Sequence, residues 1–313
     1  MNAFIGVDTS CYTTSVACVD EKGIVCDHRT VLSVKPGERG LRQSDGLFQH
    51  IKNLEKLVPE LFQTVSGLSV RAVGVSVSPR SNEDSYMPVF LAGKTVATAL
   101  AASLQVPLYP VSHQDGHVRA ALHGNEQLMG EPFLGMHISG GTTETFLVDE
   151  KLHISLLGGG EDLHAGQFVD RVGVSLGLPF PCGKHLEVLA SAADPVKCEK
   201  LPAIVRDGIC SFSGVETKAQ TLIKAGNRPE EIAYSVYDCM ARTFYKMLMY
   251  ESEKTGVDRI LIAGGVASSP LLRKLLHERF RKYGNITLFF GESALSSDNA
   301  VGVALRCRDR FIK

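Results

Sequence analysis

Two stretches of the sequence begin alike: Phe4-Ile-Gly-Val-Asp-Thr-Ser-Cys-Tyr-Thr-Thr14 and Phe133-Leu-Gly-Met-His-Ile-Ser-Gly-Gly-Thr-Thr143. They align without a gap at a constant offset of 129 residues. The identical pairs are Phe4/Phe133, Gly6/Gly135, Ser10/Ser139, Thr13/Thr142, Thr14/Thr143, Asp20/Asp149, Glu21/Glu150 and Lys22/Lys151. Each copy has an apolar run, a polar turn and an alternating run, which is typical of a β-hairpin. A long unit that occurs twice predicts two duplicated domains, since solenoids need at least three shorter units. Chance similarity of two hairpins is the alternative.

Helical and strand patterns alternate after each hairpin. We expect helices over 47–62, 90–104, 168–176, 186–193, 230–255, 270–283 and 298–307, and strands over 72–78, 107–111, 259–263 and 286–290. The alternation predicts an α/β protein with helix-covered sheets. The expected layout is an N-terminal lobe over 1–125, a C-terminal lobe over 126–295, and a closing helix within 296–313 that returns toward the first lobe. A cleft between two such lobes is a favoured ligand site.

Composition limits the functional classes. The chain has 313 residues, 44% of them hydrophobic, so two folded domains are expected rather than disorder. No apolar run reaches the roughly 20 residues that span a bilayer. The segment from Met1 to Asp8 has no basic start, so we expect a cytoplasmic protein without a membrane partner. Eight cysteines form no C-x-x-C pair, which disfavours a zinc ribbon and favours buried thiols.

The charges give no general sign of a nucleic-acid partner. Thirty-three Lys and Arg residues nearly balance 34 Asp and Glu residues, for a formal charge of -1. Any RNA contact would therefore need a local basic patch. Lys35, Arg39 and Arg42 could form one, or they could belong to a solvated loop.

Two glycine-containing segments are candidate phosphate or nucleotide loops. In Ser139-Gly140-Gly141-Thr142-Thr143, the glycines would let backbone N–H groups approach a phosphate and the hydroxyls would add donors. Ser10 occupies the equivalent turn of the first copy. In the second segment, a strand breaks at Gly264-Gly265 and a helix follows, capped by Ser268 or Ser269. A plain hairpin turn and tight strand-to-helix packing are the alternatives, and neither segment is a Walker motif.

A histidine pair suggests a metal site. On a helix, His113 and His117 would share one face, about 5 to 6 Å apart at Cβ. Asp298 is the candidate third ligand, because the last helix can return to the first lobe. This set would suit Zn²⁺ or Fe²⁺. A solvated helix face and a carboxylate that serves a helix dipole are the alternatives. Gln114 stands where a zinc protease needs its glutamate, which disfavours a protease.

Several motifs in order resemble the tRNA threonylcarbamoyladenosine synthase family, formerly called the O-sialoglycoprotein endopeptidase family. The motifs are Asp8-Thr-Ser-Cys11, His113 to His117, Ser139 to Thr143, Asp162 to Gly183, Ser211-Phe-Ser-Gly214, Ala263-Gly-Gly-Val266 and Ser297-Asp298-Asn299. The resemblance covers nearly the whole chain. It implies the actin-like ATPase superfold of sugar kinases, Hsp70 and actin, with two lobes and a nucleotide cleft.

The resemblance also implies site residues and chemistry. The metal ligands would be His113, His117 and Asp298. The adenine-nucleotide or AMP-anhydride site would include Ser139 to Thr143, Asp170, Gly183, and the loop from Gly264 through Gly265 to Ser269. The family transfers a threonylcarbamoyl group from an AMP anhydride to an adenosine of tRNA, with other protein subunits as partners. No catalytic residue is assigned.

The chain departs from the family pattern at several positions. Tyr12 and Thr13 stand where the family has Asp-Glu, Thr142 replaces His, Ser269 replaces Asn, and Cys182 replaces Gly. These changes fit a diverged paralog. Three hypotheses follow: a threonylcarbamoyl transferase with an altered acceptor or reduced activity, a non-catalytic nucleotide-binding scaffold, and a sugar-kinase-like phosphotransferase. The last is disfavoured because the first hairpin turn offers no carboxylate base.

Overall fold

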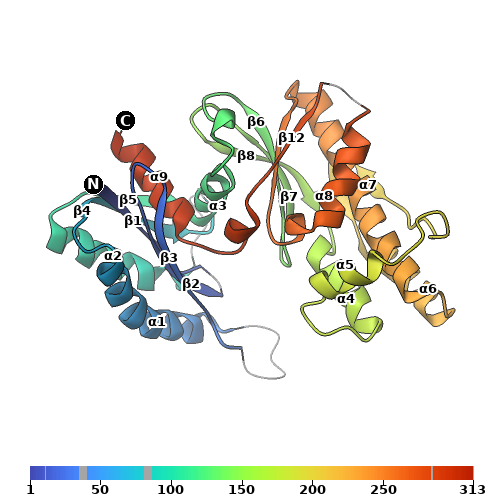
Figure 1. Ribbon diagram of the computed structural model, residues 1–313, viewed down its shortest axis with the longest axis horizontal. Coiled ribbons are helices and arrows are strands. Elements are labelled where there is room, and N and C mark those ends of the chain that lie inside the picture. The colour runs from blue at the N-terminus through green and yellow to red at the C-terminus, as the bar shows by residue number, and fades with distance from the viewer. Residues whose placement is uncertain (11, 35–40, 81–86, 283–284, 313) are drawn as a thin grey trace. The chain divides into compact units, whose positions relative to one another are not determined.

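The computed structural model describes residues 1–10, 12–34, 41–80, 87–282 and 285–312. Lys35 and Arg39 of the suggested basic patch lie outside the described residues, as does Cys11. The chain divides into two compact units (Figure 1). One unit consists of Met1–His123 and Ser297–Lys313, and the other of Gly124–Ser296.

The first unit is built on a five-stranded sheet with the order β3-β2-β1-β4-β5. Its strands are β1 (Asn2–Asp8), β2 (Thr13–Val19), β3 (Ile24–Val31), β4 (Ser69–Ser78) and β5 (Leu108–Ser112). Its helices are α1 (Gln43–Thr64), α2 (Phe90–Leu104), α3 (His113–Ala121) and α9 (Val301–Ile312). β1 pairs antiparallel with β2 and parallel with β4, so the hairpin starts the sheet.

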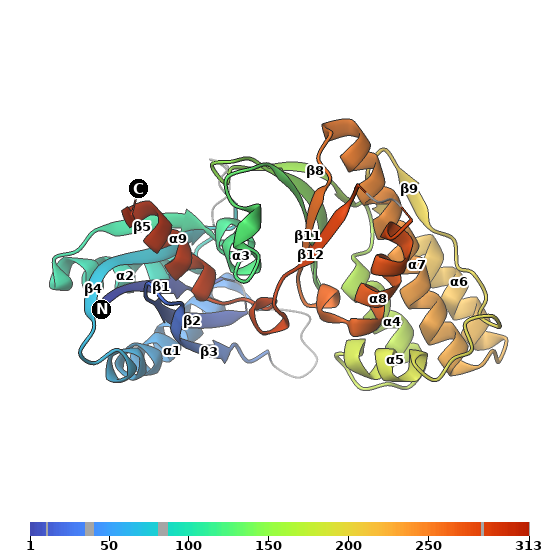
Figure 2. The same cartoon turned by 45° about the horizontal axis from the view of Figure 1, so that its top comes forward.

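Alternating residues of β1 and β4 face opposite layers of this unit. Ile5, Val7 and Val75 belong to the buried core that α1 and α2 cover. On the other face, Gly6 and Gly74 leave room for α9, because a β-carbon on either would collide with atoms of α9 or of the residue just before it. Figure 2 shows α9 against the strands on the side away from α1. The sheet therefore lies between two helical layers.

The second unit is built on a seven-stranded sheet with the order β12-β11-β6-β7-β8-β10-β9. Its strands are β6 (Phe133–Ile138), β7 (Thr143–Val148), β8 (Ile154–Gly160), β9 (Ile204–Arg206), β10 (Ile209–Ser211), β11 (Arg259–Ala263) and β12 (Thr287–Phe290). Its helices are α4 (Ala165–Ser175), α5 (Gly183–Ala190), α6 (Ser213–Lys224), α7 (Pro229–Thr255) and α8 (Pro270–Phe280). Residues of the sheet and of all these helices share one core, to which Met136, Phe168, Phe244 and Ile262 belong.

The two sheets repeat one strand pattern, which confirms the predicted duplication. The order β3-β2-β1-β4-β5 in the first unit corresponds to β8-β7-β6-β11-β12 in the second. In both units the opening hairpin is followed by a third antiparallel strand, and the first strand pairs in parallel with a later one. β10 and β9 are additions to the second sheet.

Several predicted element boundaries are confirmed and others are wrong. Helix 90–104 and strand 259–263 match α2 and β11 to the residue. The closing helix begins at Val301 rather than at 298, because the Asn299 side chain accepts a hydrogen bond from the Gly302 N–H at 3.3 Å and ends the loop there. The helix expected over 186–193 is α5, which ends at Ala190.

Some elements had no sequence prediction at all. α6 begins with Ser213-Gly214, a poor helical start, and β8 ends in three glycines that hide its strand character. β9 and β10 form a short hairpin closed by Asp207 and Gly208, which have φ values of 50° and 79°. None of the helices in the described part of the chain combines the length and hydropathy needed to cross a membrane.

Candidate functional site

His113 and His117 lie on α3, directly after β5. Ser112 fixes the start of this helix: its side chain accepts a hydrogen bond from the Asp115 N–H at 3.1 Å, and the Asp115 carboxylate accepts one from the Ser112 N–H at 3.2 Å. This capping box satisfies two free donors at the helix start. The four-residue spacing then places both imidazoles on one face, with their Nε2 atoms 2.8 Å apart.

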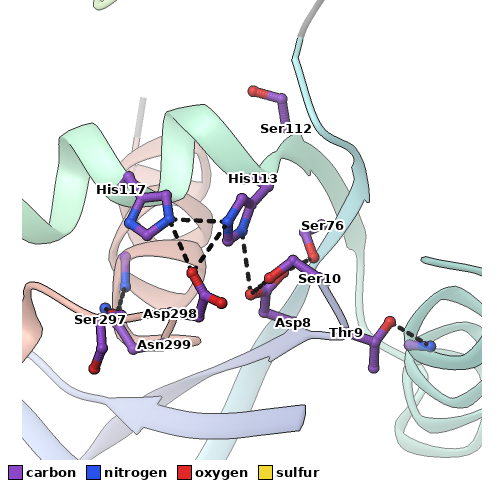
Figure 3. A network of polar contacts seen from close by, with 12 residues as sticks. Asp8, Thr9, Ser10, Ser76, Ser112, His113, His117, Ser297, Asp298 and Asn299 are labelled. Carbon is purple, nitrogen blue, oxygen red and sulfur yellow. Dashed lines mark hydrogen bonds and ion pairs between the residues drawn. The ribbon is translucent and has the colours of Figure 1, made fainter. Parts of the chain in front are cut away.

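Asp298 joins the two histidines, as the sequence suggested. Its Oδ1 atom lies 3.5 Å from His113 Nε2 and 3.3 Å from His117 Nε2 (Figure 3). The three potential ligand atoms all lie within 4.8 Å of one another. The carboxylate does not cap α9, since Asn299 supplies the hydrogen bond to Gly302. The alternative that Asp298 only serves the helix is therefore disfavoured.

Two glycines bring together α3, which carries the histidines, and α9, which directly follows the Asp298 loop. Gly302 of α9 packs on the backbone of Gly116 of α3, and a β-carbon on Gly302 would overlap the Gly116 carbonyl. The short loop before α9 then holds Asp298 beside the face of α3 that carries the two histidines. The ligand set therefore depends on a backbone contact between α3 and α9.

The electrostatics of the cluster favour a cation. Burial by itself raises the pKa of the Asp298 carboxyl, but contacts with the two imidazoles outweigh it and hold the pKa well below its usual range. Burial by itself lowers the pKa of His113, yet the Asp8 and Asp298 carboxylates raise it well above its ordinary value. Two imidazole nitrogens and a carboxylate oxygen at these separations fit one ion about 2.0 to 2.2 Å from each. Such a set suits Zn²⁺ or Fe²⁺ and leaves positions open for a ligand oxygen.

Ser10 belongs to the surroundings of this cluster. Its hydroxyl is fully buried and donates a hydrogen bond to Asp8 Oδ2 at 2.7 Å. Asp8 in turn lies 3.2 Å from His113 Nδ1. The sequence grouped Ser10 with the nucleotide loops. Ser10 belongs to the first unit, and the Ser139–Thr143 and Gly264–Gly265 loops belong to the second.

The two glycine loops of the second unit are neighbours. They follow β6 and β11, which pair in parallel, with Ala263 opposite His137. Gly140, Gly141 and Gly265 are exposed, with no atom near a β-carbon position. Gly264 differs, since its φ is +104° and its β-carbon would meet the Ile138 backbone. The loops therefore present open backbone at one end of the sheet.

The helix α4 supports the first of these loops. The Ala165 N–H donates to Thr143 Oγ1 at 3.0 Å, and a β-carbon on Gly166 would lie 2.6 Å from Gly140 Cα. Thr143 also lines a cavity of about 930 Å³ between the glycines of β8 and the β9–β10 hairpin. Thr142 is half-buried, and its carbonyl accepts the Ser139 N–H at 2.8 Å.

Asp170, Gly183 and Ser269 each make a hydrogen bond in or next to α5. Asp170 accepts the Cys182 N–H at 2.8 Å just before α5, and burial raises the pKa of Asp170. Ser269 caps α8 by accepting the Leu272 N–H at 3.2 Å, and its own hydroxyl donates to Glu187 of α5 at 2.7 Å. The Tyr237 hydroxyl donates to the Gly183 carbonyl at 2.9 Å. These bonds fix α4, α5 and the start of α8 relative to one another.

Sequence reasoning assigned no site role to Asp8, Ser76 or Glu187, although Asp8 begins one of the motifs that resemble the family. Asp8 also ends an apolar strand, which is an unusual place for a fully buried carboxylate and is a further signal that could have found it. Ser76 and Glu187 carry no such signal. Of the two residues at the positions where the resemblance implies an acidic pair, Tyr12 is exposed and Thr13 is buried at the start of β2.

Comparison with solved structures shows the class of fold. The chain superposes on component A of (R)-2-hydroxyglutaryl-CoA dehydratase from Acidaminococcus fermentans with a TM-score of 0.61, 12% identity and full coverage of both chains. It superposes on a ROK family glucokinase from Streptomyces griseus with a TM-score of 0.56 and 11% identity, covering 98% of this chain and 99% of the other. These matches and the duplicated sheets show the actin-like ATPase superfold.

Sequence relatives identify the family within this fold. A tRNA N6-adenosine threonylcarbamoyltransferase from Thermotoga neapolitana is 30% identical, covering 96% of this chain and 91% of that protein. One from Neorickettsia sennetsu is also 30% identical, with 98% and 93% coverage. The family model for tRNA N6-adenosine threonylcarbamoyltransferase matches residues 49–305. This chain therefore belongs to that family.

Proposed function

We propose that this chain is a threonylcarbamoyl transferase that binds a divalent metal and an adenine nucleotide and acts on tRNA adenosine, with reduced activity or an altered acceptor. The observation that carries the proposal is the convergence of His113, His117 and Asp298 in a member of this family. A tRNA substrate makes the cytoplasm the expected location.

The residues of the first unit would hold the metal, as Zn²⁺ or Fe²⁺. When bound, a divalent ion would supply Lewis-acid polarisation of a phosphate or carbonyl oxygen and stabilise developing negative charge. His113 and His117 would provide imidazole nitrogens and Asp298 one carboxylate oxygen. The buried Asp8 side chain would keep the His113 ring in place from its other nitrogen.

The loops of the second unit would bind ATP, AMP or the AMP moiety of the donor. The exposed backbone at Gly140, Gly141 and Gly265 offers N–H donors without side chains in the way. Ser139 and Thr142 would add hydroxyl donors. Asp170, Gly183 and Ser269 would bind the nucleoside, in a region that the α5 contacts hold rigid.

The proposed reaction transfers the threonylcarbamoyl group from its AMP anhydride to adenosine, with the carbamoyl carbon as the atom that is attacked. The exocyclic amine of adenosine attacks that carbon, the bond to the phosphate oxygen breaks, AMP leaves, and the amine loses a proton to solvent or to a base. We assign the base to no residue of this chain. Other subunits of a tRNA-modification complex would be partners, and Arg42, which is exposed, would contribute to tRNA contact.

A non-catalytic nucleotide-binding scaffold is the second candidate. Tyr12 and Thr13 favour it, because neither side chain can act as an anionic anchor or base at neutral pH. The retained ligand set favours the transferase, since a scaffold has little need of it. A phosphotransferase has no comparable support.

A modification assay separates these candidates. The purified chain would be combined with the threonylcarbamoyl-AMP donor, tRNA and the family's partner proteins, and modified adenosine measured by mass spectrometry of nucleosides. Slow modification that is lost in His117→Ala supports the transferase. Modification that His117→Ala leaves unchanged contradicts a role for the metal residues, and nucleotide binding without any modification supports the scaffold.

A further inference from the structure

Asp8 is a buried carboxylate at the end of β1. It follows the apolar residues Phe4, Ile5 and Val7, and its side chain is 0% exposed. Ser10 donates a hydrogen bond to Oδ2 at 2.7 Å, and Ser76 of β4 donates one to Oδ1. His113 Nδ1 lies 3.2 Å from Oδ2. All three neighbours lie in the same unit as Asp8.

The hydrogen bonds fix the orientation of this carboxylate. A buried charge is unfavourable unless hydrogen bonds and an opposite charge compensate it. The two serines bind different oxygens, so the carboxylate plane cannot turn freely. The sheet itself does not require an acid here, because the equivalent position of the second copy is His137. Asp8 is therefore best explained by what it faces, which is His113 (Figure 3).

Asp8 determines which nitrogen of His113 can bind a metal. A carboxylate only accepts hydrogen bonds, so His113 Nδ1 must carry the proton that it donates to Asp8. The nitrogen left to bind a cation, after loss of any proton it carries, is then Nε2, the atom that lies 2.8 Å from His117 Nε2 and 3.5 Å from Asp298 Oδ1. The ring is held in the tautomer and direction that metal binding needs.

We propose that Asp8, held by Ser10 and Ser76, is a positioning residue that orients His113 for a divalent cation at His113, His117 and Asp298. The inference rests on the proposed metal site. Asp8 itself does not bind the cation, because it contacts the ring nitrogen opposite to the one that faces Asp298. A carboxylate in this position typically raises metal affinity 10- to 100-fold.

The test measures metal affinity rather than activity. The full chain is stripped of metal and titrated with Zn²⁺ against a chelating indicator, and Co²⁺ binding is followed by its visible absorption. Asp8→Ala is expected to weaken Zn²⁺ binding about 100-fold, and Asp8→Asn about 10-fold. The asparagine keeps an acceptor for Nδ1–H but loses the charge, so it should rescue part of the affinity.

Two controls make the outcomes distinguishable. Asp20→Asn changes another buried carboxylate of this unit, at the far end of β2, and should bind Zn²⁺ as the parent does. His117→Ala removes a ligand and should lose both the affinity and the Co²⁺ spectrum. If His117→Ala loses binding while Asp8→Asn binds as tightly as the parent, the role of Asp8 is overturned, whether or not Asp8→Ala folds. A parent that binds no cation, or binds it equally without His117, overturns the metal site and this inference together.

Discussion

Gly302 of α9 packs on the carbonyl of Gly116 of α3, and this contact sets the distance between the helix that carries the two histidines and the helix that follows Asp298. We predict that Gly302→Ala forces the helices apart. It should destabilise the protein by roughly 2 to 3 kcal/mol, as overpacking does, and should weaken Zn²⁺ binding by moving Asp298 away from His117. Urea unfolding and Zn²⁺ titration at a temperature where the variant is folded would measure both effects.

Gly116→Ala is the matched control for this prediction. A β-carbon at Gly116 would lie 3.2 Å from Val303 Cγ2, a side-chain atom that can yield. The cost should be smaller than for Gly302→Ala, and metal affinity should change little. Equal losses in the two variants would show that the backbone contact at Gly302 has no special role.

The open glycines of the second unit provide a test of nucleotide binding. We predict that ATP or AMP raises the melting temperature, because a ligand at 100 times its Kd stabilises the folded state by about 2.7 kcal/mol. Gly140→Val and Gly265→Val should abolish this shift by covering the backbone N–H groups. Both positions have free space for a side chain, so the variants should fold.

Gly264→Val is not suitable for that test. Its φ of +104° and the nearby Ile138 backbone mean that valine would disrupt the fold before it affected a ligand. Ala225→Val, at the exposed end of α6, is the appropriate control and should keep the full nucleotide shift. An unchanged melting curve of the parent at millimolar ATP would count against a nucleotide site.

His50 predicts a pH dependence of stability. The ring is fully buried on α1, and burial lowers its pKa to about 4 from 6.5, against a smaller opposing effect of Asp8. The Asn53 amide donates to Thr14 Oγ1 at 3.0 Å, so the Thr14 hydroxyl is free to donate to His50 Nδ1, 2.9 Å away. This arrangement favours the neutral ring.

The sign follows from proton binding. Between pH 6.5 and 4 the unfolded state binds a proton that the folded state does not, so the free energy of unfolding falls as the pH falls, by about 3 kcal/mol from this group. His50→Gln should lack this component, and its stability deficit relative to the parent should therefore shrink toward pH 4. Urea unfolding from pH 7.5 to 4 measures the difference. His185→Gln, at an exposed position of α5, should follow the parent, and a deficit of His50→Gln that is independent of pH would refute the assignment.

Part of this site could be predicted from sequence because its residues have recognisable spacing. The interval between His113 and His117 matches one helical turn, and Asp298 stands near the end of a chain whose last helix could return to the first lobe. The duplicated hairpins likewise predict the antiparallel strand pair with which each sheet begins. Turns, apolar periodicity and helical spacing involve residues that are close together in the sequence. They can therefore be recognised without knowledge of the tertiary structure.

Asp8 and Gly302 could not be predicted in the same way, because their roles arise only from contacts between distant segments. Asp8 of β1 accepts a hydrogen bond from Ser76 of β4 and contacts His113 of α3, and Gly302 packs against Gly116. Ser10 is a third example: its place in the repeat predicts a nucleotide contact but gives no indication of the hydrogen bond that its hydroxyl donates to Asp8. Position within a repeat therefore predicts the backbone conformation of a residue better than it predicts the contacts of its side chain.

The final prediction concerns Tyr12 and Thr13, at the two positions where the sequence resemblance implies an acidic pair in the family. A phenol and an aliphatic hydroxyl are uncharged at neutral pH and cannot replace carboxylates as a base or as an anchor for the substrate amine. We therefore expect the parent to bind metal and nucleotide but to modify tRNA slowly, even with the activated donor and the partner proteins supplied.

The structure indicates which substitution tests this most cleanly. Tyr12 is 43% exposed, so Tyr12→Asp should cost little stability, whereas Thr13 is only 8% exposed and Thr13→Glu places a carboxylate in a nearly buried position. Tyr12→Asp alone should raise the rate of modification, measured by mass spectrometry of tRNA nucleosides, and the double variant should be active but less stable. Asparagine has nearly the shape of aspartate but no charge, so Tyr12→Asn should modify tRNA as slowly as the parent. Rapid modification by the parent would show that the acidic pair is dispensable, and equal rates for Tyr12→Asp and Tyr12→Asn would show that the missing charge is not what limits the reaction.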